Sequence, residues 1–239
     1  MSEAAQAPEL LTWRLFDTGE ALAQALAVEV AQTLAAALAF RGRASLAVSG
    51  GSTPRAFFDA LSLEAFDWRG VDIVLTDERW VEAGSPRANS TLLRGHLLQN
   101  AATAARFVDL KTSSATPEEG LAEAQALFET VSLPLAVVVL GMGEDGHTAS
   151  FFPQGDRLAE ALRPSLDHKL EFMHAPQCDE PRLTLTFPVL AEAGRRFLHI
   201  EGAKKRETFL RAEKSGRIED MPIRAFLRDG RPLEVFWRP

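Results

Sequence analysis

Cysteine and tyrosine are the amino acids that this chain of 239 residues most clearly lacks. Its single cysteine, Cys178, excludes an internal disulfide and a zinc site built from several thiolates. No motif surrounds Cys178, so we interpret it as an inert side chain rather than a nucleophile. Because the chain contains no tyrosine, any acid–base chemistry must use His, Asp, Glu, Lys or Cys side chains.

Long apolar runs are also missing. Residues 1–8 show no basic region followed by an apolar core, and we find no run of ~20 apolar residues in the sequence. We therefore expect no signal peptide, no membrane partner and a cytoplasmic location. The net charge of −7 argues against nucleic acid as a partner. An anionic small molecule stays compatible with this charge, because it needs only a local cluster of cations.

The remaining composition is that of an ordinary globular protein, with 46% hydrophobic and 25% charged residues. Internal repeats, low-complexity tracts and linkers are absent from the sequence. We expect a loose tail over residues 1–10 and a single domain over 11–239. The sequence leaves the oligomeric state open.

Apolar runs and helical patterns alternate along the chain. The expected strands lie near 44–48, 71–76, 107, 135–140, 170–174, 183–187, 197–200 and 233–237. The expected helices lie near 19–41, 54–61, 89–98, 116–130, 203–214 and 223–228. This alternation predicts an α/β fold with a mostly parallel sheet flanked by helices.

The most informative segment is 135–153, where a buried strand runs into a glycine turn. His147 follows this turn, at the end of a central strand, where open α/β sheets place their ligands. Free imidazole titrates near pH 6.5, so His147 is a candidate general base, with Asp145 as a candidate orienting group. The alternative is a structural or exposed histidine; the position after the turn favours a functional one.

The same turn, Gly141–Gly146, matches the G-x-G-x-x-G pattern of dinucleotide-binding folds. The pattern alone is weak. Glu144 and Asp145 stand where a pyrophosphate needs positive potential, and Pro153 restricts the helix that should follow. We therefore expect no nicotinamide or flavin cofactor. No histidine pair has zinc-site spacing, so we expect no metal.

A better anion site is the segment 49–54, which joins a strand to a helix. Gly50 and Gly51 free the backbone N–H groups to turn inward, and the helix that begins near Pro54 offers its positive end. The hydroxyl groups available there are those of Ser49, Ser52 and Thr53. The alternative is a simple turn in which Ser52 or Thr53 caps the helix. The P-loop lysine is missing, which argues against a nucleoside triphosphate.

Other charged residues also follow strands. Asp77 and Arg79 end the strand near 71–76, where the alternative is a solvated turn with a surface ion pair. Lys205 begins a helix, and cations are unfavourable at a helix N-terminus unless an anion binds there. Arg182 is either a second anion contact or an ordinary charge at a strand end.

Taken together and in this order, these segments resemble the 6-phosphogluconolactonase family. The resemblance runs from about residue 15 to the C-terminus and is most specific in the glycine–histidine turn. The segments that carry it are Ser49–Pro54, Asp77–Arg79, Leu140–Ser150 with Phe152-Pro153, Arg182–Thr186 and Gly202–Lys205.

The resemblance implies a modified Rossmann-like fold similar to that of the glucosamine-6-phosphate deaminases. It implies hydrolysis of a phosphorylated sugar lactone in the pentose phosphate pathway, without metal or organic cofactor. Residues 49–53 and Lys205 would hold the phosphate, Asp77 and Arg79 would lie beside the sugar, and His147 would activate water. Arg182 is a weaker assignment.

One departure concerns Ala88-Asn89, where the family often has Ser-Asn; Asn89 stays a candidate orienting residue. Amino-sugar isomerisation on the same scaffold is the main alternative. Those deaminases carry an acidic residue before the proline that follows the glycine–histidine turn, whereas this chain has Phe151-Phe152-Pro153. A non-catalytic phosphosugar sensor is a second alternative.

Overall fold

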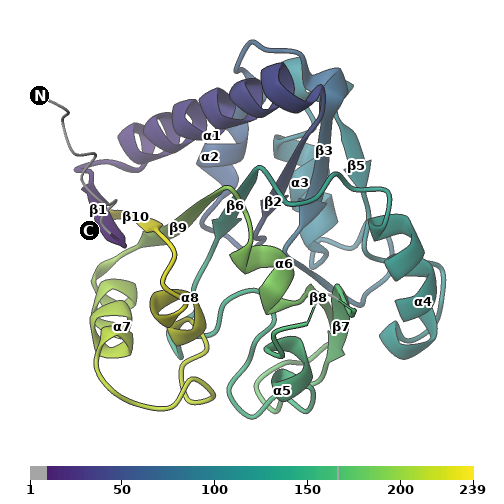
Figure 1. The fold of residues 1–239 in the computed structure, drawn as a ribbon, viewed down its shortest axis with the longest axis vertical. Helices are drawn as coiled ribbons and strands as arrows, with labels where there is room; N and C mark the ends of the chain where they lie inside the picture. The colour runs from purple at the N-terminus through teal and green to yellow at the C-terminus, as the bar shows by residue number, and fades with distance from the viewer. Residues whose placement is uncertain (1–9, 166) are drawn as a thin grey trace, which may run out of the picture.

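A seven-stranded parallel sheet forms the centre of the molecule (Figure 1). The computed structural model describes residues 10–165 and 167–239. The strands of this sheet are β1 (Leu11–Leu15), β2 (Ala44–Val48), β3 (Val71–Leu75), β5 (Arg106–Val108), β6 (Val137–Leu140), β9 (Arg195–Glu201) and β10 (Leu233–Arg238). The predicted α/β class with a mostly parallel sheet is confirmed; β1 was not predicted. The loose tail predicted over 1–10 lies outside the described residues, apart from Leu10.

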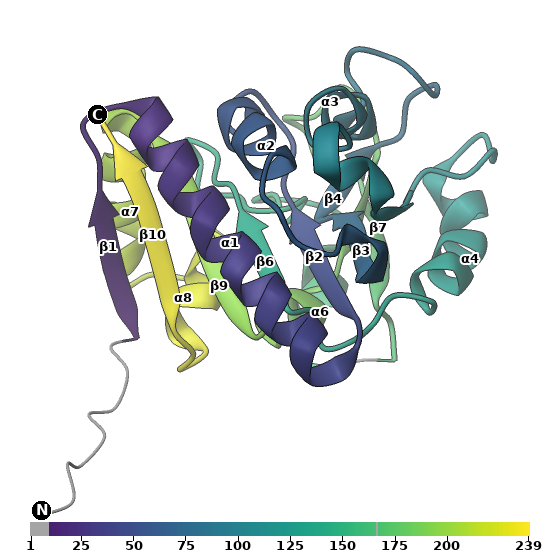
Figure 2. The ribbon, with the colours of Figure 1, turned by 90° about the horizontal axis from the view of Figure 1, so that it is seen from above.

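Helices cover both faces of the sheet. One face carries α1 (Gly19–Arg41), α2 (Arg55–Ser62) and α3 (Asn89–His96), which Figure 2 shows crossing in front of the strands. The other face carries α6 (Phe187–Ala191), α7 (Ala203–Glu213) and α8 (Arg224–Arg228). The chain also forms α4 (Pro117–Phe128), α5 (Leu158–Ala161) and the 3₁₀ turns Trp68–Gly70 and Asn100–Ala104. Thr116 caps α4, its hydroxyl accepting from the Glu119 N–H.

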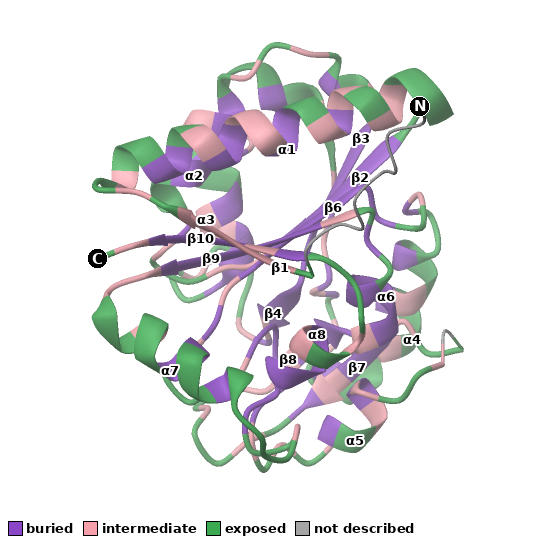
Figure 3. Cartoon of the chain, turned by 60° about the vertical axis from the view of Figure 1, so that its left-hand side comes forward, coloured by how far each residue is buried: buried purple, intermediate pink, exposed green. Residues whose placement is uncertain are grey.

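The long helix α1 needs a correction to the sequence analysis. By length and composition it is apolar enough to cross a membrane, although we had expected no such segment. In the fold, its Leu22, Leu26, Val30 and Leu34 are buried. They face α2 and the strands beneath, as the purple stripe along α1 in Figure 3 shows. The apolar character of α1 is therefore used in packing against the core.

A second, smaller sheet was not predicted. It is antiparallel and contains β4 (Asp77–Arg79), β8 (Arg182–Leu185) and β7 (Leu170–Met173), in that order. Helices α4 and α5 pack against β7. The predicted strand end at Asp77–Arg79 is thus itself a strand, which pairs with β8.

The order of strands in the large sheet, β1-β10-β9-β6-β2-β3-β5, contains one reversal. From β2 the chain moves outward to β3 and β5, then returns to place β6 on the other side of β2. The loops after β2 and β6 consequently diverge and leave a crevice at the carboxyl ends of the strands. Open α/β sheets bind their ligands at such a switch point.

One continuous apolar core joins α1, the central strands and the second sheet. The strands β2, β3 and β6 are buried along their whole length (Figure 3). The organisation as a single domain from residue 11 stays a prediction.

Candidate active site

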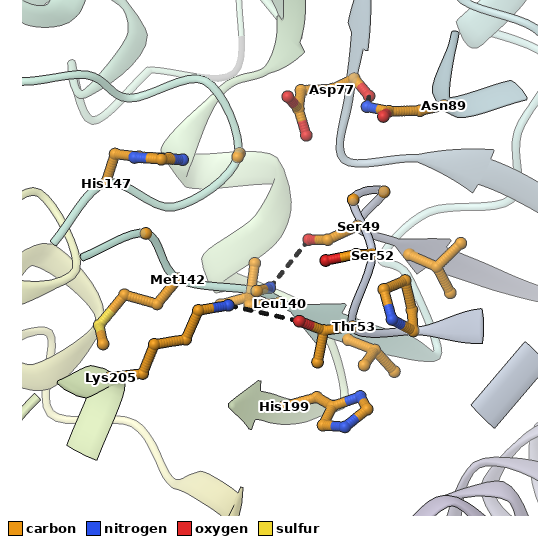
Figure 4. Close-up of a pocket in the computed structure, with 18 of the residues that line it drawn as sticks. Ser49, Ser52, Thr53, Asp77, Asn89, Leu140, Met142, His147, His199 and Lys205 are labelled. Carbon is orange, nitrogen blue, oxygen red and sulfur yellow. Dashed lines mark hydrogen bonds between the residues drawn. The ribbon is translucent and has the colours of Figure 1, made fainter. Parts of the chain in front are cut away.

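A cavity of about 610 Å³ opens at the switch point, beyond the carboxyl ends of β2, β3 and β6. All the site residues predicted from the sequence line it. They are Ser49, Gly50, Gly51, Ser52, Thr53, Asp77, Arg79, Asn89, Asp145, His147, Arg182 and Lys205. Figure 4 shows His147 on one side of this space, Asp77 and Asn89 on another, and Thr53 and Lys205 on a third.

His147 and Asp145 form a hydrogen-bonded pair. The imidazole Nδ1 lies 2.6 Å from Asp145 Oδ1, and the His147 backbone N–H donates to the same oxygen at 3.1 Å. Because a carboxylate only accepts, Nδ1 carries the proton of this bond, which in the neutral imidazole leaves the lone pair on Nε2. Burial acts to raise the pKa of Asp145, but the hydrogen bonds and charge of His147 outweigh it, so this pKa lies below its usual value. The imidazole is one-third exposed, with its ring centre 4.5 Å from that of Phe152.

Glycine is required at two positions around these groups. A Cβ on Gly143 would lie 2.2 Å from His147 Cε1 and 2.7 Å from Asp145 Oδ1. A Cβ on Gly50 would lie 2.2 Å from the Asn89 side chain. A larger residue at either position would therefore displace these side chains from where they lie. The Gly143 N–H also donates to the His147 carbonyl at 2.9 Å, which closes the turn.

The loop 49–54 has the features of an anion site. No side-chain hydrogen bond caps α2, so Ser52 and Thr53 do not cap it as the simpler interpretation required. Lys205, from the first turn of α7, donates to Thr53 Oγ1 at 3.3 Å, although 152 residues separate the two. Burial lowers the pKa of Lys205 from its usual value. Its neighbour Lys204 faces outward near Glu144, at 3.8 Å.

Asp77 is held from three sides. Its Oδ2 accepts from the Ser150 hydroxyl at 2.7 Å and its Oδ1 accepts from the Thr76 hydroxyl at 3.0 Å. Its backbone carbonyl accepts from Asn89 Nδ2 at 3.0 Å. The side chain is 7% exposed and lines the cavity. The alternative of a solvated turn with an ion pair does not describe this residue.

Glu78, next along β4, is a buried carboxylate that sequence analysis did not single out. It is 0% exposed and accepts from the backbone N–H groups of Arg79, Asn89 and Ser90 at 2.6–2.7 Å. Burial raises the pKa of Glu78 despite these bonds. The Glu78 carboxylate therefore caps the N-terminus of α3, because the N-cap residue Ala88 has no side-chain acceptor.

Two arginines extend the positive side of the cavity. Arg79 and Arg182 pair directly across β4 and β8, and both line the cavity. Within the described residues, neither they nor Lys205 has a carboxylate oxygen within 4.0 Å. Arg79 donates instead to the Arg87 carbonyl at 2.7 Å. Three cations without carboxylate partners make the cavity suited to an anionic ligand.

Sequence analysis did not single out every residue that lines the cavity. His199, which sequence analysis did not name, is 3% exposed and lines the cavity, and its Nε2 lies 3.1 Å from Glu201 Oε1. Burial lowers the pKa of His199.

No helix follows the turn after β6 until Leu158, so the dinucleotide pattern lacks its structural context. Over residues 10–165 and 167–239, no group of three or more His, Cys, Asp or Glu residues is placed to hold a metal ion.

Comparison with known proteins gives consistent relatives. A family model described as glucosamine-6-phosphate isomerases/6-phosphogluconolactonase matches residues 17–237. A 6-phosphogluconolactonase from Rhizobium meliloti strain 1021 is 50% identical over 226 residues, which span 94% of this chain and 97% of that protein. The crystal structure of a 6-phosphogluconolactonase from Shewanella baltica OS155 is 40% identical, with a TM-score of 0.92 over 96% of this chain and 98% of that one.

A monomeric glucosamine-6-phosphate deaminase superposes with a TM-score of 0.75 over 95% of this chain and 97% of that one, at 18% identity. This likeness concerns the fold, which is the one that the sequence predicted. The family match covers nearly the whole chain, and the more similar relatives all bear one name. The chain therefore belongs to the glucosamine-6-phosphate isomerase/6-phosphogluconolactonase family, on its 6-phosphogluconolactonase branch.

Proposed function

We propose that this protein hydrolyses 6-phosphoglucono-1,5-lactone to 6-phosphogluconate, with His147 as the general base that activates water. The observation that carries this proposal is the shared cavity. An imidazole oriented by a carboxylate faces an anion-binding loop and three cations across about 610 Å³, a volume suited to a small phosphorylated sugar. The names of the close relatives support the substrate.

The phosphate binds first in this scheme. The backbone N–H groups of residues 50–53, the hydroxyls of Ser52 and Thr53, and the ammonium of Lys205 surround the dianion. Arg182 adds a further positive charge. Binding of this remote group holds the lactone C1 near His147, so that the reaction becomes effectively unimolecular.

His147 then acts twice. Its Nε2 takes a proton from a water molecule, and the resulting hydroxide-like oxygen attacks C1 to form a tetrahedral oxyanion. Asp145 stabilises the imidazolium through Nδ1–H. When the intermediate collapses, the bond between C1 and the ring oxygen breaks, and the imidazolium returns its proton to that oxygen. The product is 6-phosphogluconic acid, which ionises and releases one proton.

Charge that develops on the oxyanion needs a nearby donor. Arg79 is the candidate, because its guanidinium lines the cavity without a carboxylate partner. Asp77 and Asn89 accept and donate hydrogen bonds toward the sugar hydroxyls on the other side of the cavity. None of these steps calls on a metal or an organic cofactor.

Two other functions can be told apart from this one. Amino-sugar isomerisation needs an acidic group after the glycine–histidine turn, and this chain has Phe151 and Phe152 there, 0% and 4% exposed. A phosphosugar sensor would bind the ligand without turnover. We also propose a cytoplasmic location, and we expect no nucleic-acid or membrane partner, in keeping with the charge of −7.

The test compares proton release from freshly generated 6-phosphogluconolactone by the wild type and by His147→Ala, after subtraction of spontaneous hydrolysis. General-base catalysis is worth about 10²–10⁴-fold, so kcat should fall by at least about 10². His174→Ala is the matched control: His174 makes the same pair of bonds, to Asp156, but lies outside the cavity. Its activity should equal that of the wild type.

Three results would count against the proposal. Near-normal turnover by His147→Ala would remove this residue from the mechanism. Release of ammonia from glucosamine 6-phosphate would favour the deaminase alternative. Binding of the product 6-phosphogluconate without any lactone turnover would favour a sensor.

A further inference from the structure

One amide and two hydroxyl groups join the separate loops of the cavity in a chain of hydrogen bonds that ends on a carboxylate. The Gly141 N–H, after β6, donates to Ser49 Oγ, after β2, at 2.9 Å, as the dashed line at Ser49 in Figure 4 shows. Ser49 Oγ lies 3.0 Å from Thr76 Oγ1, and Thr76 donates to Asp77 Oδ1 at 3.0 Å. The chain therefore ends on the carboxylate of Asp77.

The direction of each bond in this chain is determined by its ends. A carboxylate only accepts, so the single hydroxyl hydrogen of Thr76 goes to Asp77. Thr76 Oγ1 must then accept from Ser49, whose own oxygen accepts from Gly141. Every hydrogen thus points toward Asp77, and the last bond, to a charged acceptor, is of the stronger kind.

Ser150 completes the arrangement from the opposite side. It donates to Asp77 Oδ2 at 2.7 Å, so each carboxylate oxygen has its own hydroxyl donor. Thr76 and Ser150 are both 0% exposed. They cannot touch a ligand, and they fix the rotation of the carboxylate about its Cβ–Cγ bond.

The directions of these hydrogen bonds also change the role expected for Ser49. A phosphate oxygen accepts hydrogen bonds, and the Ser49 hydroxyl hydrogen is already directed to Thr76. Ser49 could donate to a phosphate only by breaking the chain that reaches Asp77. The backbone N–H groups of residues 50–53 and the hydroxyls of Ser52 and Thr53 have no such engagement.

We propose that Ser49, Thr76 and Ser150 are positioning residues that aim the Asp77 carboxylate at the sugar, and that Ser49 is not a phosphate ligand. This inference rests on the proposed lactone hydrolysis for its kinetic consequences. Its geometric content, the orientation of Asp77, does not depend on which reaction the cavity performs.

The decisive variants are Thr76→Val, which keeps the shape and loses the hydroxyl, and Thr76→Ser, which keeps the hydroxyl. Misplacing a group by about 1 Å can cost about 10²-fold, so we expect Thr76→Val to lower kcat/KM about tenfold or more. Thr76→Ser should restore most of this loss. Thr186→Val is the matched control: Thr186 is 2% exposed, donates to the His168 carbonyl and lies outside the cavity. It should leave kcat/KM unchanged.

A double-mutant cycle with Asp77→Asn separates positioning from a merely structural effect. If Thr76 acts through Asp77, adding Thr76→Val to the Asp77→Asn enzyme should lower kcat/KM little further. An equal loss in both backgrounds would overturn the inference, as would failure of Thr76→Ser to rescue. The proposal also requires that Ser49→Ala lower kcat/KM in the wild type but not in the Asp77→Asn enzyme. If Ser49→Ala lowered kcat/KM in both, Ser49 would be a phosphate ligand after all.

Crystal structures of the Thr76 variants test the geometric part by themselves. The Asp77 carboxylate should rotate in Thr76→Val and keep its orientation in Thr76→Ser, and an unmoved carboxylate in Thr76→Val would overturn the inference. A wild type without lactonase activity would instead refute the proposed function. That result would leave the orientation of Asp77 to be decided by the same two structures.

Discussion

At the scale of single residues, Gly143 has the clearest link between the backbone and the chemistry. A Cβ there would overlap the His147 ring, at 2.2 Å from Cε1 and 2.3 Å from Nδ1. The ring is one-third exposed and can swing outward to make room. We therefore predict that Gly143→Ala changes the free energy of unfolding by less than about 1 kcal/mol, because an exposed ring is easily displaced. By contrast, kcat should fall about 10²-fold, because the imidazole leaves Asp145.

The matched control is Gly95→Ala on an exposed turn of α3, where a Cβ meets nothing within 4 Å. A helical Gly→Ala change of this kind should stabilise the protein by about 0.5–1 kcal/mol and leave kcat unaltered. Urea unfolding and lactonase assays on both variants check the pair of expectations. A Gly143→Ala enzyme with normal kcat would mean that catalysis does not need the His147–Asp145 contact.

Residue patterns predicted which side chains meet in the cavity but not how they are bonded. The glycine turn and the strand ends were enough to place His147, Asp77 and Lys205 together, because parallel strands end at one edge. The contact between Asp145 and His147 depends on a turn geometry that the sequence does not specify. The partners of Ser49 could not be predicted either, since Thr76 lies at the bend between β3 and β4 and Gly141 is 92 residues away.

At the scale of secondary-structure elements, the amino ends of the central strands are tied together at Asp72. This side chain, 1% exposed on β3, accepts from Arg43 before β2 at 2.8 Å, from Arg106 on β5 at 2.7 Å and from the Ser132 N–H ahead of β6 at 3.3 Å. Burial acts to raise the pKa of Asp72, but these donors outweigh it, so its pKa is lowered in the folded protein.

We predict that Asp72→Asn lowers the free energy of unfolding at pH 7 by about 1–3 kcal/mol, as expected for hydrogen bonds to a buried charged group. A carboxyl group with a lowered folded-state pKa stabilises the fold above its unfolded pKa of about 3.9, and this contribution is lost as pH falls through the folded pKa. The difference between wild type and Asp72→Asn should therefore be constant from pH 7 to about 5 and shrink below about 4.

Urea unfolding across this pH range measures the effect, with kcat at pH 7 as the control. Asp72 lies at the end of the sheet opposite the cavity, so activity under folding conditions should be unchanged. A difference that stays the same down to pH 3 would show that the charge of Asp72 contributes nothing and that only its shape matters.

Elements with a clear local sequence signal were predictable, and those that form only by pairing with a distant segment were not. The four-residue spacing of the buried Leu22, Leu26, Val30 and Leu34 predicts α1, the Thr116-Pro117 start predicts α4, and apolar runs predict β2, β3 and β6. The second sheet depends on β4, whose three residues Asp77–Arg79 are all charged and resemble a solvated turn in sequence. They form a strand because β8 pairs with them and because the buried Glu78 carboxylate accepts hydrogen bonds from N–H groups of α3.

At the scale of the whole molecule, the cavity exists only when distant segments have folded together. One of its walls comes from residues 49–54, and the lysine beside that loop comes from position 205. A ligand that binds this arrangement therefore binds the folded state alone and raises the free energy of unfolding by RT ln(1 + [L]/Kd). At a hundredfold excess over Kd this is about 2.7 kcal/mol, which for a protein of this size corresponds to roughly 5–10 °C in Tm.

We predict that the product 6-phosphogluconate raises the Tm of the wild type by this amount. His147→Ala should respond equally, because the proposed mechanism places His147 at C1 and not at the phosphate. Lys205→Met should lose most of the shift, since it removes the ammonium beside Thr53 while keeping the apolar stem that packs in the half-buried position. Thermal unfolding at several ligand concentrations measures all three. If Lys205→Met were stabilised as strongly as the wild type, the phosphate would have to bind elsewhere, and Arg79 with Arg182 would be the remaining cations in the cavity able to hold it.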